Sequence, residues 1–189
     1  MKKIVSLIMC LCSVYANSQE GIPFFVNYPA SVYQAHNRNF DVVCDSCGNV
    51  YFANFEGILH YDYSRWETIY TPGFSRVTRL FRDSEGRIWV GGYNVFGRIE
   101  RDGRGCITLR TLLSDLDTNF LGELEDMAEI DKRIYLKATS GGYYTVQSDS
   151  ILAPVQVLPA QLQEKWRNQS SVSMNRAFSL PGGETISIN

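Results

Sequence analysis

The sequence predicts an all-β fold, a partial β-propeller with three four-stranded antiparallel blades and part of a fourth. The chain is rich in aromatic residues, with 11 Tyr, 10 Phe and 3 Trp in 189 residues, and such side chains suit pleated, buried surfaces. Hairpin patterns with Gly turns recur at a spacing of about 40 residues, as stacked blades require. The central strand of each pattern is apolar at successive positions, which indicates burial on both faces.

The first 18 residues predict a secretory signal peptide. Two lysines precede an apolar run from Ile4 to Val14, and small residues follow at Ala16 and Ser18. This run is too short to span a bilayer comfortably. We therefore expect a periplasmic or secreted protein, cleaved after Ser18 or alternatively after Ala16. Residues 19–39 are then expected to form an extended segment that precedes the first blade.

The first two blades contain the best internal repeat. Asp45-Ser-Cys-Gly48 aligns with Asp83-Ser-Glu-Gly86 at an offset of 38 residues. In such a turn Asp accepts backbone hydrogen bonds and Gly supplies a positive φ. A doubly buried strand follows the turn, at Val50 to Ala53 in the first copy and Ile88 to Val90 in the second.

The third strand of each blade begins at a second Gly turn. Aligning Gly57 with Gly97 at this turn requires a two-residue insertion around Asn94 to Phe96. In the third copy the first turn becomes Asp131-Lys132-Arg133, and the fourth copy turns at Pro181-Gly-Gly183. Blades are therefore expected at residues 40–75, 77–115, 126–158 and 176–189, with a short helical turn at 161–168. An open arc of blades should expose two apolar faces, because each blade buries its faces on its neighbours.

These hairpins resemble the two-component regulator propeller repeat, which occurs outside the membrane in sensor proteins, many of them from Bacteroidetes. The residues that carry the resemblance are Asp83-Ser-Glu-Gly-Arg-Ile-Trp-Val-Gly-Gly92, and Asp45 to Asn54 with Gly57 to Asp62 is similar. Gly21-Ile-Pro-Phe, Tyr33-Gln-Ala and Trp66 resemble a subgroup whose propeller precedes a triple-tyrosine domain, a membrane helix and a cytoplasmic helix-turn-helix or kinase module.

The resemblance implies a periplasmic sensory propeller of a signal-transduction or transcriptional regulator, not itself an enzyme. The output domain and any membrane attachment would lie in sequence missing from this chain. Further blades or a dimer partner would complete the ring, and the ligand would be a glycan or another small molecule. Two alternatives remain open: a secreted carbohydrate-active propeller of the lyase or hydrolase type, and a protein-interaction scaffold.

Composition argues against several other functions. The net charge is −2, or −4 without the two leader lysines, and no polybasic stripe occurs, so we expect no nucleic-acid binding. The two histidines, His36 and His60, lie in no metal-ligand or triad motif, so no catalytic residue, metal or cofactor is expected. For Cys44 and Cys47 we expect a local disulfide rather than redox chemistry, since no second CxxC and no following helix accompany them.

The candidate ligand site follows from the geometry of hairpins in a propeller, whose loops gather at one end of the blades. Amide, carboxylate and aromatic side chains occupy matching loops of the first two copies, and together they suit sugar recognition through hydrogen bonds and stacking. The alternative is that these aromatics fill gaps between blades and these polar groups cap turns. The candidate residues are Asn54, Phe55, Glu56, Tyr93, Asn94 and Phe96.

Overall fold

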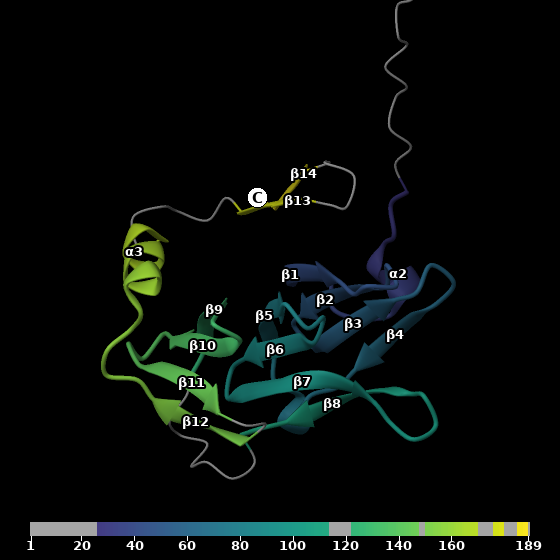
Figure 1. The fold of residues 1–189 in the computed structure, drawn as a ribbon. Coiled ribbons are helices and arrows are strands. Elements are labelled where there is room, and N and C mark those ends of the chain that lie inside the picture. Colours follow the sequence, from purple (N-terminus) through teal and green to yellow (C-terminus); the bar gives the residue numbers. More distant parts are fainter. Residues whose placement is uncertain (1–25, 114–121, 148–149, 170–175, 180–184, 189) are drawn as a thin grey trace, which may run out of the picture.

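The computed structural model describes residues 26–113, 122–147, 150–169, 176–179 and 185–188. Three four-stranded antiparallel sheets follow one another along the chain, each with its strands in chain order (Figure 1). Blade 1 contains β1 (Asn39–Cys44), β2 (Val50–Asn54), β3 (Gly57–Tyr61) and β4 (Trp66–Ile69). Blade 2 contains β5 (Val77–Arg82), β6 (Ile88–Gly92), β7 (Val95–Arg101) and β8 (Ile107–Thr111). Blade 3 contains β9 (Leu124–Ile130), β10 (Arg133–Ala138), β11 (Tyr143–Gln147) and β12 (Ser150–Pro154).

The three sheets are arranged as propeller blades. Their first strands, β1, β5 and β9, contact one another along the inside of an arc, and β4, β8 and β12 lie on its outside (Figure 1). A further antiparallel pair, β13 (Arg176–Ser179) and β14 (Thr185–Ile188), follows in the chain. The predicted all-β fold with three four-stranded antiparallel blades is confirmed, and β13 and β14 form a two-stranded sheet where part of a fourth blade was predicted. The predicted leader, residues 1–18, and the turn at Pro181-Gly-Gly183 lie outside the described residues.

The predicted Asp turn has the expected hydrogen bonds in the first two blades. In blade 2, Asp83 Oδ1 accepts the backbone N–H groups of Glu85 and Arg87 at 3.0 and 2.8 Å. Asp45 Oδ1 accepts two backbone N–H groups in the same way in blade 1. Gly48 and Gly86 have φ of 89° and 81°, a region that glycine enters without strain.

The predicted insertion near Asn94 is wrong. Asn54 pairs with Gly57 across the β2–β3 hairpin, and Gly92 pairs with Val95 across the β6–β7 hairpin. Both hairpins therefore have two-residue loops, and the structural counterpart of Gly57 is Val95 rather than Gly97. The extra residues lie instead in the β7–β8 hairpin, whose strands have seven and five residues against five and four in β3 and β4.

Three short elements connect or precede the blades. The segment predicted to be extended, of which residues 26–39 are described, includes the one-turn helix α2 (Ala30–Tyr33). Pro29 permits this turn because a proline just before a helix loses no hydrogen bond there, and Gln34 ends it with φ 51°. The 3₁₀ turn η1 (Pro72–Phe74) joins β4 to β5. Helix α3 (Ala160–Gln169), longer than the expected turn, follows β12.

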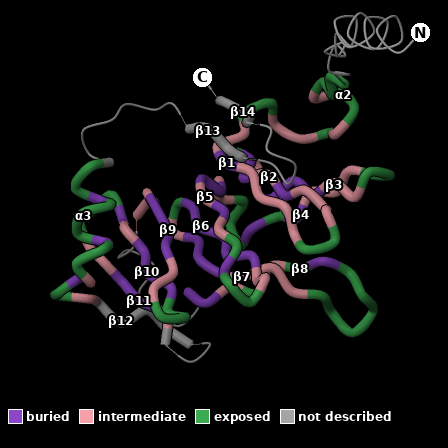
Figure 2. The backbone as a smooth tube through the Cα atoms, turned by 45° about the horizontal axis from the view of Figure 1, so that its top comes forward, coloured by how far each residue is buried: buried purple, intermediate pink, exposed green. Residues whose placement is uncertain are grey.

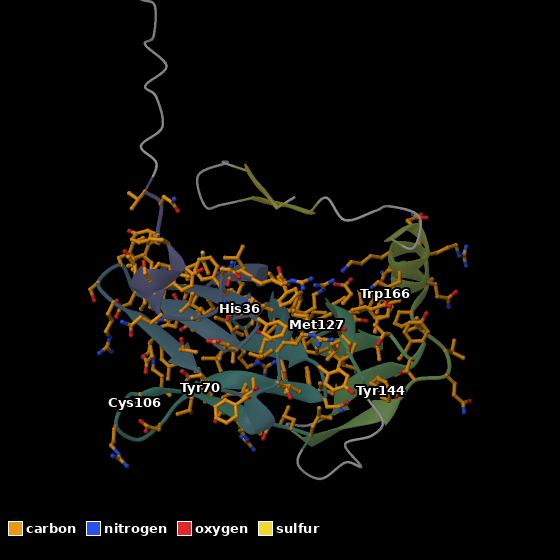
Figure 3. The ribbon with its side chains drawn as sticks, turned by 180° about the vertical axis from the view of Figure 1, so that it is seen from behind. His36, Tyr70, Cys106, Met127, Tyr144 and Trp166 are labelled. Carbon is orange, nitrogen blue, oxygen red and sulfur yellow. The ribbon has the colours of Figure 1, made fainter. Side chains whose placement is uncertain are left out.

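The apolar cores lie between the blades, where buried residues gather in Figure 2. Blades 1 and 2 enclose one cluster that includes Tyr51, Ile58 and Val90. Blades 2 and 3 enclose another, in which Trp89 and Phe96 stack with ring centroids 5.6 Å apart. Met127, labelled in Figure 3, belongs to the same cluster. This interleaving explains why the central strands are apolar at successive positions.

The described ends of the arc are covered, contrary to the expectation of two exposed apolar faces. On the free face of blade 1, Tyr28 contacts Trp66 with ring centroids 5.2 Å apart, and the Tyr28 and Tyr61 hydroxyls lie 3.0 Å apart. On the free face of blade 3, Leu162 and Trp166 of α3 are buried with 2% and 3% exposure. Neither covering element is a blade, so the repeat pattern could not predict it.

Candidate ligand-binding end of the blades

Strand order defines one end of the arc as a shared surface. Because the strands are antiparallel and in chain order, the β2–β3, β6–β7 and β10–β11 hairpins lie at the same end as the β4–β5 and β8–β9 connections. We call this end the hairpin end. All six predicted ligand residues belong to the β2–β3 and β6–β7 hairpins, so the geometric part of that prediction agrees with the topology.

One backbone hydrogen bond recurs at this end in all three blades. The first loop residue of each hairpin donates its N–H to the carbonyl oxygen of the residue at or just before the inner strand. Phe55 donates to Arg38 at 3.1 Å, and Tyr93 donates to Arg76 at 3.2 Å. In blade 3, Thr139 donates to Glu123 at 2.8 Å. Each bond ties a hairpin loop to the charged residue that immediately precedes the inner strand of its blade.

Four large aromatic side chains are exposed at the hairpin end. Phe55 and Tyr93 come from the two hairpin loops and are 40% and 48% exposed. Tyr70 and Phe74 come from the β4–β5 connection, are 56% and 74% exposed, and contact each other edge to face at 5.5 Å. Exposed apolar surface of this kind often marks an interaction site.

A charged pair lies beside one of these rings, that of Tyr93. Arg76 binds Glu123 with two hydrogen bonds of 3.0 and 2.9 Å, which joins blades 2 and 3. The pair holds the pKa of Glu123 below its usual value and raises that of Arg76, chiefly through these hydrogen bonds. The Arg76 guanidinium also lies 5.3 Å from the Tyr93 ring centroid. Both side chains of the pair are about one-third exposed, at 35% and 32%, so each can still contact a ligand.

Three of the six predicted residues have structural roles. Phe96 lies in β7 and is fully buried in the core between blades 2 and 3. It was predicted to be a loop residue because the alignment contained an insertion that the structure does not have. Asn54 is also fully buried, and its Nδ2 donates to the carbonyl oxygen of His36 at 2.6 Å. Asn94, with φ 49°, accepts the Gly122 N–H at 3.0 Å. These positions agree with the alternative of gap-filling aromatics and turn-capping amides.

The other three remain accessible. Phe55 contacts the His36 ring at 4.7 Å, Glu56 is half-buried, and Tyr93 is exposed. Their role in ligand binding stays a prediction. Sequence reasoning missed Tyr70, Phe74, Arg76 and Glu123 because they lie in connections between repeats, where no repeated pattern draws attention to them. The exposed Tyr-Thr-Pro-Gly-Phe run at 70–74, an aromatic pair around a turn, was the available signal.

The local disulfide expected between Cys44 and Cys47 is not formed, and both are free thiols. Cys44 ends β1 and is half-buried, whereas Cys47 is exposed in a turn whose backbone is held by Asp45. Burial is the main cause that raises the pKa of the Cys44 thiol.

His60 is buried with 2% exposure, and neither ring nitrogen has a hydrogen-bond partner among the described residues. Burial lowers its pKa. Across the described ranges, no three His, Cys, Asp or Glu side chains gather closely enough to hold a metal ion. Within the part of the chain that the structure describes, no helix has the length and apolar character needed to cross a membrane.

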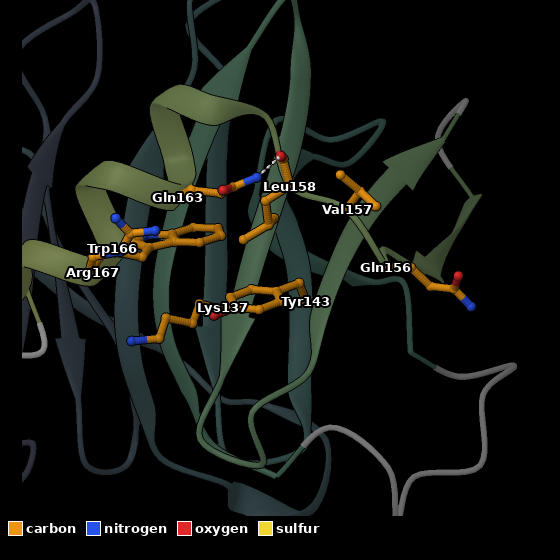
Figure 4. Close-up of a pocket in the computed structure, with 8 residues that line it drawn as sticks. All are labelled: Lys137, Tyr143, Gln156, Val157, Leu158, Gln163, Trp166 and Arg167. Atoms are coloured by element: carbon orange, nitrogen blue, oxygen red, sulfur yellow. Dashed lines mark hydrogen bonds between the residues drawn. The ribbon is translucent and has the colours of Figure 1, made fainter.

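A cavity of about 460 Å³ lies between blade 3 and α3, away from the predicted site (Figure 4). Lys137 and Tyr143 line it from the sheet, Trp166 and Arg167 from the helix, and Val157 from the connection. Tyr143 and Trp166 stack with ring centroids 5.5 Å apart at an angle of 6°.

Residues 72–94 match the family model described as two component regulator propeller. This segment covers the end of the β4–β5 connection, β5, β6 and the β6–β7 loop, which contain the Asp83 turn. No curated protein matches the chain.

Among solved structures, a streptogramin B lyase is 16% identical, with a TM-score of 0.47 over 79% of this chain and 53% of the other. A catalytically inactive virginiamycin B lyase from Staphylococcus aureus with quinupristin is 10% identical, with a TM-score of 0.48 over 79% and 54%. The chain spans about half the length of these structures.

Proposed function

We propose that this chain is the periplasmic ligand-recognition propeller of a signal-transduction regulator, and that its hairpin end binds a glycan. The observation that carries the proposal is the presence of four exposed aromatics at the hairpin end, one of which, Tyr93, lies against the guanidinium of the Arg76–Glu123 pair. Aromatic faces stack on the C–H faces of sugar rings, and a guanidinium with a carboxylate can hydrogen-bond neighbouring hydroxyl groups. The match of residues 72–94 to a regulator propeller supports the sensory role.

Binding is tested with the full mature chain against a panel of oligosaccharides. A bound sugar at a hundred times its Kd should stabilise the fold by about 2.7 kcal/mol and raise Tm accordingly. The double variant Phe55→Ala/Tyr93→Ala should weaken binding at least tenfold, because it removes two stacking faces. Tyr63→Ala is the matched control, since Tyr63 is 69% exposed but lies in the β3–β4 turn at the opposite end. Equal binding by the double variant and the control would contradict the proposed site.

The regulator part of the proposal has a separate test. Reading the coding frame beyond Asn189 should reveal further blades followed by a membrane helix and a signalling module. Cell fractionation with N-terminal sequencing should find a periplasmic protein that begins at Gln19. A coding frame without any signalling part would contradict the regulator role.

The two alternatives differ in what the same samples would do. Turnover on a polysaccharide panel would favour the lyase or hydrolase type of propeller. Capture of a stable protein partner, without any shift of Tm by small molecules, would favour a scaffold.

A further inference from the structure

The inner strand of each of the three blades contains a β-bulge, and the residue after the bulge binds the element that packs on that blade. In β1, β5 and β9 the register with the neighbouring strand skips one residue, at Phe40, Thr78 and Glu125. A bulge of this kind re-aims the side chain beside it. The residue after the bulge is polar in every blade: Asp41, Arg79 and Asp126.

In the first two blades this residue binds the inner strand of the next blade. Asp41 Oδ2 accepts the Leu80 backbone N–H of β5 at 3.1 Å. The Arg79 guanidinium donates to the Glu125 carbonyl oxygen of β9. In both blades the bond joins a side chain of one inner strand to the backbone of the next. The Asp41 carboxylate accepts a hydrogen bond from that backbone, whereas the Arg79 guanidinium donates one to it.

In blade 3 the same position binds a helix. Asp126 Oδ2 accepts the Trp166 indole N–H at 2.8 Å and lies 3.3 Å from Lys165 Nζ. Around this bond, Leu158, Leu162 and Trp166 pack on Ala128 and Tyr135 of blade 3. The corresponding face of blade 2 is the one that packs against blade 3. Helix α3 thus occupies the place that the next inner strand occupies on blades 1 and 2 (Figure 1).

The helix fills this face incompletely. The cavity of about 460 Å³ lies between α3 and the sheet residues Lys137 and Tyr143 (Figure 4). Between blades 1 and 2, by contrast, the facing sheets form one buried cluster. A ten-residue helix is narrower than a four-stranded sheet, so the face that it covers has room for a larger occupant.

We propose that this face of blade 3 is a blade-docking surface, covered by α3 in the structure, whose second and mutually exclusive occupant is the β13–β14 sheet. β13 is the first strand after α3 in the chain and pairs antiparallel with the strand after it, as β1, β5 and β9 pair with β2, β6 and β10. When this sheet docks, a backbone N–H of β13 replaces the Trp166 indole at Asp126, and α3 leaves the face.

Hydrogen exchange of the full chain, followed by mass spectrometry, tests the exchange of occupants. The double variant Leu162→Ala/Trp166→Ala removes the buried anchors of α3, and Gln161→Ala/Glu164→Ala changes two exposed residues of the same helix as a matched control. We expect the anchor variant to lose protection in α3, to gain at least tenfold slower exchange in β13 and β14, and to keep the protection of β9 and β10. The control should exchange like the unmodified chain.

The proposal is overturned if β9 and β10 lose protection together with α3 while β13 and β14 stay unchanged, because the face then has no second occupant. It is equally overturned if protection in α3 does not change. Trp166→Phe is a milder variant that keeps most of the apolar packing but removes the N–H donor to Asp126. It should shift the exchange of α3 and β13 in the same directions by about threefold, and an unchanged pattern would count against the proposal.

Discussion

Replacing Asp83 with Asn should destabilise the protein much more than the same change at Asp45. The two residues begin equivalent turns and bind the backbone alike, but their second carboxylate oxygens have different partners. Asp83 Oδ2 accepts the Trp89 indole N–H at 2.8 Å and the Arg87 Nε–H at 2.6 Å. Asp45 Oδ2 accepts an amide N–H from Asn49 at 2.7 Å and the Tyr51 hydroxyl at 3.3 Å.

The size of the difference follows from which partners can adapt. The Trp89 indole only donates and is 1% exposed, so an Asn amide nitrogen leaves it without an acceptor at a cost of about 1–3 kcal/mol. Losing the ionic bond from the one-third exposed Arg87 adds about 1 kcal/mol. The Tyr51 hydroxyl can instead turn and accept from the new amide. We therefore expect about 3 kcal/mol for Asp83→Asn and about 1 kcal/mol for Asp45→Asn.

Urea unfolding followed by circular dichroism measures both variants. With an m-value of about 2 kcal/mol/M, the midpoint should fall by about 1.5 M for Asp83→Asn and about 0.5 M for Asp45→Asn. Equal shifts would refute the reasoning, because the shared backbone bonds would then account for the whole effect.

The hydrogen bonds of Asp83 also predict that the stability of the fold depends on pH. Burial alone would raise the pKa of Asp83, but hydrogen bonds from Trp89 and Arg87 outweigh it and hold the pKa below its usual value. A depressed carboxyl pKa stabilises the fold above the unfolded pKa of about 4, and this contribution is lost as the pH falls through the folded pKa. The difference in the free energy of unfolding between Asp83→Asn and the unmodified protein should therefore become smaller below about pH 4.

Three further predictions concern single residues. His60→Leu should stabilise the fold by about 1 kcal/mol at pH 7.5, because it removes a buried ring without partners. At pH 5.5 the same variant should be stabilised by about 1 kcal/mol more, because His60 binds a proton in the unfolded chain whereas burial lowers its pKa in the folded one. Urea midpoints at both pH values measure this difference. Gly92→Ala should cost at least about 2 kcal/mol, since a Cβ would lie 2.1 Å from a backbone carbonyl oxygen, whereas Gly103→Ala meets nothing within 4 Å and should leave the melting temperature unchanged. Mass spectrometry after brief alkylation should find Cys106 modified before Cys44, whose burial raises its pKa, and the reverse order would contradict this assignment.

Local features of the fold were readable from sequence. The Asp-x-x-Gly turns form as predicted because their hydrogen bonds join residues two to four positions apart, within one short loop. The insertion was misplaced because two glycines were aligned by identity, although Gly57 and Val95 occupy the same strand position. Backbone pairing, rather than residue type, decides such an equivalence.

By itself, the sequence determined the strands, the turns and their repeated order, since these depend on neighbouring residues and on the alternation of buried side chains. Which candidate residues are accessible depends on the tertiary structure, because Asn54 is buried against the segment before β1 and Phe96 is buried between blades 2 and 3. The tertiary structure also joined Arg76 to Glu123 across 47 positions, and it set Trp166 against Asp126. Contacts between residues so far apart in the chain depend on how blades pack together, and no local pattern encodes that packing.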